Sequence, residues 1–335
     1  MRSISYSEIS TALTCPARWD FRYGGHLAGD ALAPKLVAPQ LREGRAWGAA
    51  VAVWHQHSTD LLAGFFARRA VQETLSVDLE AIEAAGGWKA LNEVVEMEER
   101  LGAMLDDYAR QAVLIPDLHR LEDEIEVGVP SRTGRQSSTL YRYLCRIDGY
   151  TEERGRWLVE FKLRRQLTPI DLIQMNPQHR WYAWAHQHET GEPIIGVLID
   201  ERLNAVPVEP RILKNGHVSQ DKHQMTTPAM YARACETTDT PVDPEVVEAL
   251  AARSWQQQVP IQFRPSELEE AGRELTSAAR LIRDLDSGDL APIRNAARAR
   301  CSGCEFRSIC PNPTDRLLID ANFKRVAPKR LRTAA

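Results

Sequence analysis

Apolar and polar residues alternate along the middle of the chain, and this pattern predicts β-strands. The alternation is clear in EIEVGVP (124–130) and in LYRYLCRIDGY (140–150), with a Ser/Thr/Gly-rich turn between them. Two further runs, RWLVEFKL (156–163) and IIGVLID (194–200), predict a third and a fourth strand. We therefore expect a sheet in the middle of the chain.

Helical spacing of apolar residues dominates the first third of the chain. Residues 5–25 are expected to contain a short helix with Ser7 as its N-cap. In residues 40–115 apolar residues recur at spacings of three and four, which predicts helix throughout. Gly86 and Gly87 are expected to interrupt this helical region.

Two more helices are expected later in the chain. Residues 171–188 predict a helix that is kinked at Pro177. Residues 265–286 are amphipathic and start with a capping-box-like pair, Ser266 and Glu269. Strands in mid-chain with helices at both ends predict an α/β or α+β fold.

The composition bounds the class of protein. Hydrophobic residues make up 43% of the 335 residues, enough for the core of one large domain or two smaller ones. No apolar run approaches the ~18–20 residues that cross a membrane, and the first residues lack the apolar stretch of a signal peptide. We therefore expect a cytoplasmic location and no membrane association.

The charge is nearly balanced, with 42 Lys and Arg against 46 Asp and Glu and a formal net charge of −4. This value does not indicate a broad basic surface for nucleic acid. The end of the chain differs, because a basic tail without acids contains Lys324, Arg325, Lys329, Arg330 and Arg332.

The patterns divide the chain into three regions. Residues 1–120 are expected to be a helical N-terminal region, and residues 121–260 to be the core that contains the sheet. Residues 261–335 are expected to be a helical C-terminal region that includes the basic tail.

Four cysteines come from opposite ends of the chain. Cys15 lies in LTCP, and Cys301, Cys304 and Cys310 lie in CSGCEFRSIC. In a reducing compartment cysteines favour metal binding over disulfides. Four thiolates can hold a [4Fe–4S] cluster or a Zn²⁺ ion, and either would join the two ends of the chain.

Asp148, Glu160 and Lys162 carry candidate chemistry on the second and third expected strands. Residues two apart on a strand point to the same side, so Glu160 and Lys162 face one way. Asp148 joins them if the two strands are neighbours. Carboxylates suit Mg²⁺ or Mn²⁺, which polarise a phosphoryl oxygen and activate water, and an ammonium can orient that water. The same spacing also fits an ordinary surface ion pair.

Four segments, in order, resemble the PD-(D/E)xK nuclease superfamily, in its RecB-like iron–sulfur exonuclease branch. They are SYSEISTALTCPARWDFRY, the pair RIDG and VEFK, PQHRWYAWA, and the closing C-x2-C-x5-C. The branch includes AddB-type nuclease domains, CRISPR-associated adaptation nucleases and phage exonucleases. The resemblance implies an α/β fold with a restriction-endonuclease-like core. In that fold a central mixed sheet is flanked by helices, and a metal cluster joins the helical N-terminal and C-terminal segments.

The resemblance also implies a metal-dependent DNA exonuclease that acts on single-stranded or unwound ends, in recombination, repair or phage DNA processing. Asp148 and Glu160 would hold Mg²⁺ or Mn²⁺, Lys162 would assist the water, and Gln178 and Tyr182 would complete the catalytic site. The four cysteines would bind a [4Fe–4S] cluster. A helicase, recombinase or integrase partner and a homo-oligomer fit the same family.

One position departs from the family pattern. The family usually has a His in a G-x-x-V-H-like setting, where WGAAVA places Ala52. His55, one helical turn later, is a candidate replacement ligand; otherwise the site relies on a backbone carbonyl and water, or is weakened. A weakened site makes a nuclease-fold DNA-binding or assembly protein the alternative function. Arg164 and Arg165, after the third strand, are candidates for contacts with the DNA backbone.

Overall fold

The structure, a computed structural model, describes residues 1–77, 79–111, 113–131, 137–152 and 155–329. Its helices are α1 (Tyr6–Thr14), α2 (Pro16–Trp19), the π-helix η1 (Asp20–Gly24), α3 (Pro39–Gln56), α4 (Ala63–Ser76), α5 (Leu79–Gln111), α6 (Ile170–Met175), α7 (Pro177–Thr190), α8 (Pro228–Thr237), α9 (Pro244–Ala251), α10 (Pro265–Ser287), α11 (Arg298–Cys301) and α12 (Arg316–Asn322). Its strands are β1 (Arg2–Ser5), β2 (Ala31–Pro34), β3 (Asp123–Pro130), β4 (Ser137–Ile147), β5 (Gly149–Thr151), β6 (Trp157–Arg164), β7 (Gly196–Leu203), β8 (Gln256–Gln262) and β9 (Phe323–Val326).

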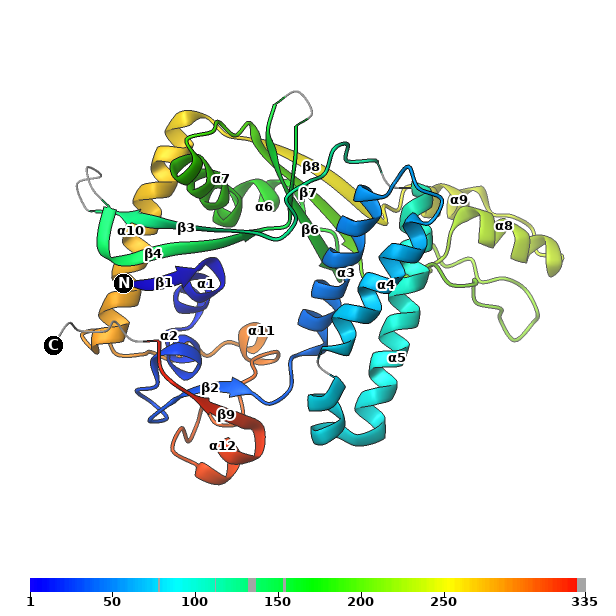
Figure 1. Cartoon of the computed structure of the whole chain (residues 1–335). Helices are drawn as coiled ribbons and strands as arrows, with labels where there is room; N and C mark the ends of the chain where they lie inside the picture. Colours follow the sequence, from blue (N-terminus) through cyan, green and yellow to red (C-terminus); the bar gives the residue numbers. More distant parts are fainter. Residues whose placement is uncertain (78, 112, 132–136, 153–154, 330–335) are drawn as a thin grey trace.

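Two mixed sheets occupy the centre of the molecule (Figure 1). One has the order β1-β4-β3, with β1 parallel to β4. The other has the order β5-β6-β7-β8, with β6 parallel to β7. Because β4 ends at Ile147 and β5 begins at Gly149, the chain passes from the first sheet to the second at Asp148. This mixed α/β arrangement agrees with the expected fold class.

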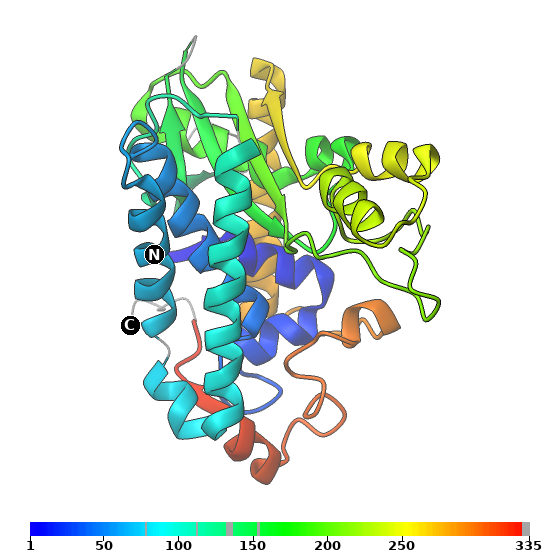
Figure 2. The same ribbon diagram turned by 90° about the vertical axis from the view of Figure 1, so that its right-hand side faces the viewer.

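Helices cover the sheets on two sides (Figures 1 and 2). Helices α7 and α10 pack against each other and against β3, with a core that includes Trp181, Trp184 and Leu275. Helices α3, α4 and α5 pack beside β6 and enclose a second core that includes Val159 and Phe161. Strand β6 therefore lies between two helical layers, so its alternate residues point into different environments.

The predicted strands and later helices are present, with corrections at several boundaries. The kink near Pro177 is a break between α6 and α7 at Asn176. Gly86 and Gly87 do not interrupt the helix, because α5 runs from Leu79 to Gln111. Since most helical stability comes from packing of an apolar face, tertiary contacts outweigh the poor helix propensity of glycine.

Both predicted helix caps were misplaced. Ser5, and not Ser7, caps α1, because its Oγ accepts the backbone N–H of Glu8. At α10 the N-cap is Arg264, whose backbone N–H donates to Glu267 Oε2 at 2.7 Å, in place of the predicted pair Ser266 and Glu269. In both cases the helix begins two residues earlier than the cap residues alone suggested, at a residue whose backbone is extended.

The two end regions are not purely helical. Strand β1 pairs with the central strand β4. Strand β2 pairs with β9, which lies near the other end of the chain. A small separate core lies under the β2–β9 pair and contains Phe21, Leu32, Phe306, Ile309, Ile319 and Phe323. The ends of the chain are therefore joined directly by backbone pairing and apolar packing.

The basic tail is only partly described. Arg325 forms ion pairs with Asp30 and Asp320, and the backbone N–H of Lys329 donates to the carbonyl of Tyr23 at 2.9 Å. Arg330 and Arg332 lie outside the described residues. Across the described residues, no helix has both the length and the apolar character needed to cross a membrane.

Candidate active site and cysteine cavity

Asp148, Glu160 and Lys162 converge where β4 passes into β5 beside β6. Asp148 Oδ2 accepts the backbone N–H of Phe161 at 2.8 Å, so its carboxylate lies against β6 between the other two residues. Lys162 forms an ion pair with Glu160 Oε1 on the same face of the strand. Glu160 is 3% exposed. The structure thus brings these three predicted residues together around the buried Glu160, with Asp148 and Lys162 half-buried, and not in an exposed surface ion pair.

The electrostatics of this group favour an added cation. Burial raises the pKa of Glu160 to about 7, with the charge of Asp148 as the next cause. Burial also raises the pKa of Asp148, against the opposing effect of Lys162. Burial alone would lower the pKa of Lys162, but the two carboxylates outweigh it and hold that pKa above its ordinary value. Two buried carboxylates beside one ammonium carry excess negative charge that a divalent ion would relieve.

Helix α7 places Gln178 and Tyr182 at Glu160. Asn176 caps the helix, because its Oδ1 accepts the backbone N–H of Gln178 at 3.0 Å. The side-chain Nε2 of Gln178 donates to Glu160 Oε1 at 3.1 Å. Burial raises the pKa of Tyr182, helped by the negative charge of Glu160. Both residues that the family resemblance implied therefore lie beside the buried carboxylate.

Tyr6 and Glu122 also border the group, and neither was expected from the sequence. The Tyr6 hydroxyl donates to Asn176 Oδ1 at 3.0 Å. The backbone N–H of Glu122 donates to the carbonyl of Asp148 at 3.4 Å. Burial raises the pKa of Glu122, and the charge of Asp148 is the second cause. The only sequence signal for Glu122 is an acid immediately before a predicted strand, which is too common to select it.

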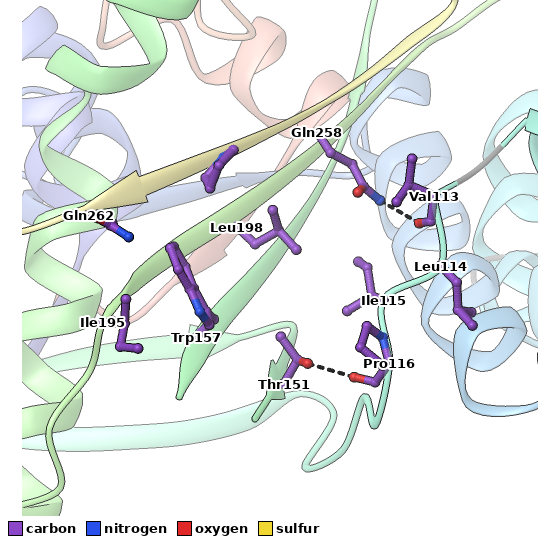
Figure 3. A pocket seen from close by; sticks show the side chains of 11 residues that line it. Val113, Leu114, Ile115, Pro116, Thr151, Trp157, Ile195, Leu198, Gln258 and Gln262 are labelled. Atoms are coloured by element: carbon purple, nitrogen blue, oxygen red, sulfur yellow. Dashed lines mark hydrogen bonds between the residues drawn. The ribbon is translucent and has the colours of Figure 1, made fainter. Parts of the chain in front are cut away.

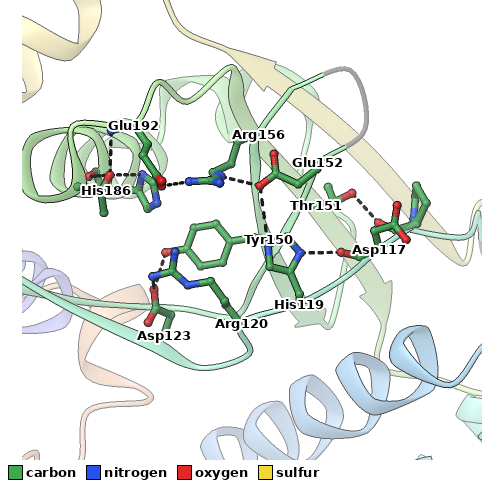
Figure 4. Close-up of polar contacts among 12 residues, drawn as sticks. Asp117, His119, Arg120, Asp123, Tyr150, Thr151, Glu152, Arg156, His186 and Glu192 are labelled. Carbon is green, nitrogen blue, oxygen red and sulfur yellow. Dashed lines mark hydrogen bonds and ion pairs between the residues drawn. The ribbon is translucent and has the colours of Figure 1, made fainter.

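The segment that carries Glu122 is anchored on Tyr150 (Figure 4). Arg120 and Glu122 have positive φ angles of 48° and 55°, a left-handed conformation that is uncommon outside glycine. His119 exchanges two backbone hydrogen bonds of 3.0 Å with Tyr150, whose hydroxyl donates to Asp123 Oδ2 at 2.8 Å. The guanidinium of Arg120 lies 4.8 Å from the centre of the same ring. These contacts hold the left-handed residues in place beside the carboxylate group.

His55 does not join the carboxylates, so its predicted role as a replacement ligand is corrected. Its ring stacks on Phe161 at 5.8 Å, and Phe161 points to the opposite face of β6 from Glu160. Its Nδ1 accepts the backbone N–H of Ile115 at 3.2 Å, and its Nε2 contacts the Tyr108 hydroxyl at 2.9 Å. Burial lowers the pKa of His55 to about 4, so the ring is neutral. Both ring nitrogens are used within the core.

Ala52 occupies the same helical layer as His55. It is 5% exposed and belongs to the core between α3 and β6. The position where the family usually has a histidine is therefore filled by a small apolar side chain.

The four predicted cysteines line one cavity of about 280 Å³. Cys15 contributes from the start of α2, and Cys301, Cys304 and Cys310 contribute from the segment before α12. Phe306 lies between them in the sequence and lines the same cavity. The side chains that were expected to act together are thus gathered around a common space.

Protein contacts already join the two segments around this cavity. The side chain of Asn295 donates to the carbonyl of Thr14 at 2.9 Å, and Arg18 forms an ion pair of 2.7 Å with Glu305. Among the described residues, no group of three or more His, Cys, Asp or Glu side chains is arranged to hold a metal ion. A role for a metal in joining the ends therefore remains a prediction.

A larger apolar cavity, of about 540 Å³, lies elsewhere on the second sheet (Figure 3). Trp157, Leu198 and Pro260 line it from the sheet, and Ile115 and Pro116 line it from the segment after α5. None of the carboxylates described above lines this cavity, so it is separate from the charged group.

Comparisons with solved structures, curated proteins and family models give different results for this chain. A solved structure titled "Crystal structure of SSO0001" aligns with 93% of this chain and 87% of its own, at 12% identity and a TM-score of 0.34. A comparison with curated proteins found no match. The family model described as the PD-(D/E)XK nuclease superfamily matches residues 3–311, which include Asp148, Glu160 and Lys162. The chain therefore belongs to the PD-(D/E)XK nuclease superfamily.

Proposed function

We propose that the protein is a Mg²⁺- or Mn²⁺-dependent DNA exonuclease that hydrolyses phosphodiester bonds at single-stranded or unwound DNA ends. The observation that carries the proposal is the buried group in which Asp148, Glu160 and Lys162 meet. Exonuclease action and roles in recombination, repair or phage DNA processing are supported by the ordered resemblance to the RecB-like branch. From the same resemblance we expect the protein to act with a helicase, recombinase or integrase partner, or as a homo-oligomer.

The residues divide the work of hydrolysis. Asp148 and Glu160 would hold the divalent ion, which when bound polarises the phosphoryl oxygen and lowers the pKa of water. Lys162, kept protonated by the two carboxylates, would orient the attacking water and offset the negative charge that develops on the phosphate. Gln178 holds Glu160 through its 3.1 Å hydrogen bond. Its amide therefore fixes the carboxylate for ion binding before the ion arrives.

We propose further that the cysteine cavity holds a [4Fe–4S] cluster. A single Zn²⁺ ion requires four sulfurs at about 2.3 Å from one point. The four cysteines line a cavity of about 280 Å³, and among the described residues no three or more such side chains are arranged to hold a metal ion, so the choice of a cluster rests on the family resemblance. Four thiolates around a wider space suit a cluster of several atoms. Its role would be structural, since the cavity lies between the two ends of the chain.

The activity is tested with three end-labelled or closed substrates: linear single-stranded DNA, linear double-stranded DNA and circular single-stranded DNA. With Mg²⁺ or Mn²⁺, the wild type is expected to degrade the linear single strand and to spare the circle, because an exonuclease needs an end. Glu160→Gln should be inactive. Glu124→Gln, which changes the same charge on an exposed residue of β3, should be fully active.

Two results would change the proposal. Cleavage of the circle at the rate of the linear strand would replace exonuclease by endonuclease. DNA binding without hydrolysis in any divalent metal would favour the alternative, a DNA-binding or assembly protein that keeps the nuclease fold. The buried Ala52 at the usual histidine position is the observation that keeps this alternative open.

The cluster is tested by anaerobic purification followed by iron, sulfide and zinc analysis. A brown protein with about four irons and four sulfides per chain is expected. A colourless protein with one zinc per chain would indicate a zinc site in place of the cluster. A metal-free protein that still unfolds in one cooperative transition would contradict both the cluster and the zinc site.

A further inference from the structure

Glu201 is a buried carboxylate on the same face of the second sheet as the proposed catalytic group. It is 1% exposed, and in the register of the sheet it pairs with Lys162 on β6 and with Gln257 on β8. Register partners in a sheet share a face, so Lys162, Glu201 and Gln257 form one row across the strands. Glu201 does not contact Glu160 or Asp148 in any described hydrogen bond, so it belongs to a neighbouring position on that face.

Four donors satisfy the Glu201 carboxylate. They are Arg164 Nε at 3.0 Å, the backbone N–H of Thr168 at 2.9 Å, Thr168 Oγ1 at 2.9 Å and Gln257 Nε2 at 2.9 Å. Burial alone would raise the pKa of Glu201, but these hydrogen bonds outweigh it and hold the pKa below its ordinary value. A buried carboxylate is costly unless it is paired and hydrogen-bonded. The four hydrogen bonds offset the free-energy cost of burying Glu201, and Arg164 is the one charged donor among them.

This arrangement orients the Arg164 guanidinium. Glu201 engages Nε, the nitrogen nearest the chain, and the Arg164 side chain remains 39% exposed. Among the described residues, the terminal nitrogens of Arg164 form no hydrogen bond or ion pair. A guanidinium held at Nε presents its outer edge in a fixed direction, and that edge matches the oxygens of a phosphate.

The position of Arg164 relative to Lys162 determines which phosphate it can reach. Glu160, Lys162 and Arg164 are spaced by two residues, so they lie on one face of β6. Arg164 is about 6.6 Å further along the strand than Lys162, from two residues at ~3.3 Å each. The scissile phosphate lies at the metal group, so Arg164 reaches a neighbouring phosphate of the same strand.

We propose that Arg164 forms a second phosphate subsite, which binds a non-scissile phosphate of the DNA strand next to the one that is hydrolysed. Glu201 is the positioning residue for this subsite. The inference rests on the proposed nuclease function, because it assumes that DNA crosses the carboxylate group. Arg165, the next residue, is exposed and has no described partner, so it provides a matched charge control.

The test measures binding without turnover. A fluorescent single-stranded oligonucleotide is titrated in the presence of EDTA at several KCl concentrations. The proteins are the wild type, four single variants and one double variant: Arg164→Ala, Arg164→Lys, Arg165→Ala, Glu201→Gln and Arg164→Ala/Glu201→Gln. Arg164→Ala is expected to weaken binding about tenfold and to lower the slope of log K against log salt by about 0.7, as for one lost phosphate contact. Arg165→Ala is expected to change affinity by about threefold or less, with a smaller change in slope.

The other variants separate positioning from charge. Arg164→Lys is expected to restore the salt slope but only part of the affinity, because an ammonium replaces the charge without the Nε contact. Glu201→Gln should weaken binding only when Arg164 is present, so the double variant should bind no worse than Arg164→Ala. Circular dichroism melts of each variant verify that it is folded. If Glu201→Gln unfolds, the comparison of Arg164→Ala with Arg165→Ala still tests the subsite, because both arginine side chains are at least partly exposed.

Equal affinity and equal salt slope for Arg164→Ala and Arg165→Ala would overturn the subsite. Absence of DNA binding by the folded wild type would overturn it too. A failure of the nuclease proposal is distinguishable, because a wild type that shows the Arg164-dependent slope but never hydrolyses DNA would keep the subsite and remove the enzyme.

Discussion

The carboxylate group and the cysteine cavity are built in opposite ways. Asp148, Glu160 and Lys162 come from strands that follow each other directly in the sequence, and the β5–β6 hairpin brings them together. Cys15 and Cys310 lie near opposite ends of the chain and are brought to one cavity only by contacts between distant segments. The first site therefore depends on local pairing, and the second depends on long-range closure.

The two regions also differ in what holds them together without a metal. The carboxylate group gathers negative charge around the buried Glu160, which costs stability and which the proposed divalent ion would relieve. The region around the cysteines has its own apolar core and the β2–β9 pairing, which hold the ends together independently. Loss of the metal should therefore abolish activity at the first site, whereas at the second it should remove only the folding free energy that a bound cluster adds, without separating the two ends.

The largest effect is expected when Lys162 is replaced by Met, which keeps the length of the side chain without its charge. The rate of hydrolysis should fall about 10³-fold, equivalent to about 4 kcal/mol in the activation barrier. The reason is that the negative charge that develops on the phosphate loses the ammonium that offsets it. The iron content should not change. Single-turnover rates on linear single-stranded DNA measure the loss, with Glu124→Gln as the control. A fall of less than tenfold would remove Lys162 from the chemistry.

Replacement of Cys304 by Ser should have the reciprocal effect. The proposed cluster should be lost and the melting temperature should fall by about 10 °C, because metal binding at such sites contributes folding free energy. The folded fraction should still hydrolyse DNA. Cys235→Ser, which alters a buried cysteine away from the cavity, controls for loss of a buried thiol. An unchanged melting temperature and iron content in Cys304→Ser would contradict the proposal that Cys304 binds a cluster that stabilises the protein.

The affinity for the divalent ion should depend on pH at the carboxylate group. The pKa of Glu160 is about 7 in the empty site, so below that pH the ion must displace a proton. The affinity for Mn²⁺ should therefore fall about tenfold per unit below about pH 7 and level off above it. Calorimetric titration between about pH 5.5 and 8.5 measures this. Affinity that stays constant over the range would mean that Glu160 is not the ligand.

The smallest effect is expected for Glu160→Gln in the absence of divalent ions. The pKa of Glu160 is raised in the folded protein from 4.5 to about 7, so its contribution to stability is present below pH 4.5 and is lost as pH rises through about 7. Glutamine cannot ionise, so the variant should be more stable than the wild type by about 2 kcal/mol near pH 8, with little difference near pH 4. Thermal melts at the two pH values test this. A variant that is less stable at both would show that the ion pair with Lys162 outweighs the burial cost.

The carboxylate group could be predicted because its information is local. Alternation on β6 places Glu160 and Lys162 on one face, and a short connection makes Asp148 a neighbour. His55 could not be placed in the same way, since its helical spacing from Ala52 says nothing about which side of β6 the helix covers. The packing of α3 against Phe161 decided that it faces the core.

Glu201 shows a second limit of sequence reasoning. It lies in the apolar run around β7, directly after Asp200, and the two acids point to opposite faces. Asp200 is buried with Tyr108 and Gln258, whereas Glu201 is buried with Arg164 and Thr168. Only the register of the sheet separates an acid of the core from one that positions an arginine.

The amino-acid sequence by itself predicted strands β3, β4, β6 and β7, the longer helices, the family and the residues of the proposed carboxylate site, because periodicity and short connections act over a few residues. The tertiary structure alone decided the partners of His55, Glu122 and Glu201, the pairing of β2 with β9, and the gathering of the cysteines around one cavity. These contacts join residues that are distant in sequence, and their geometry follows from how the layers pack, which no local pattern encodes.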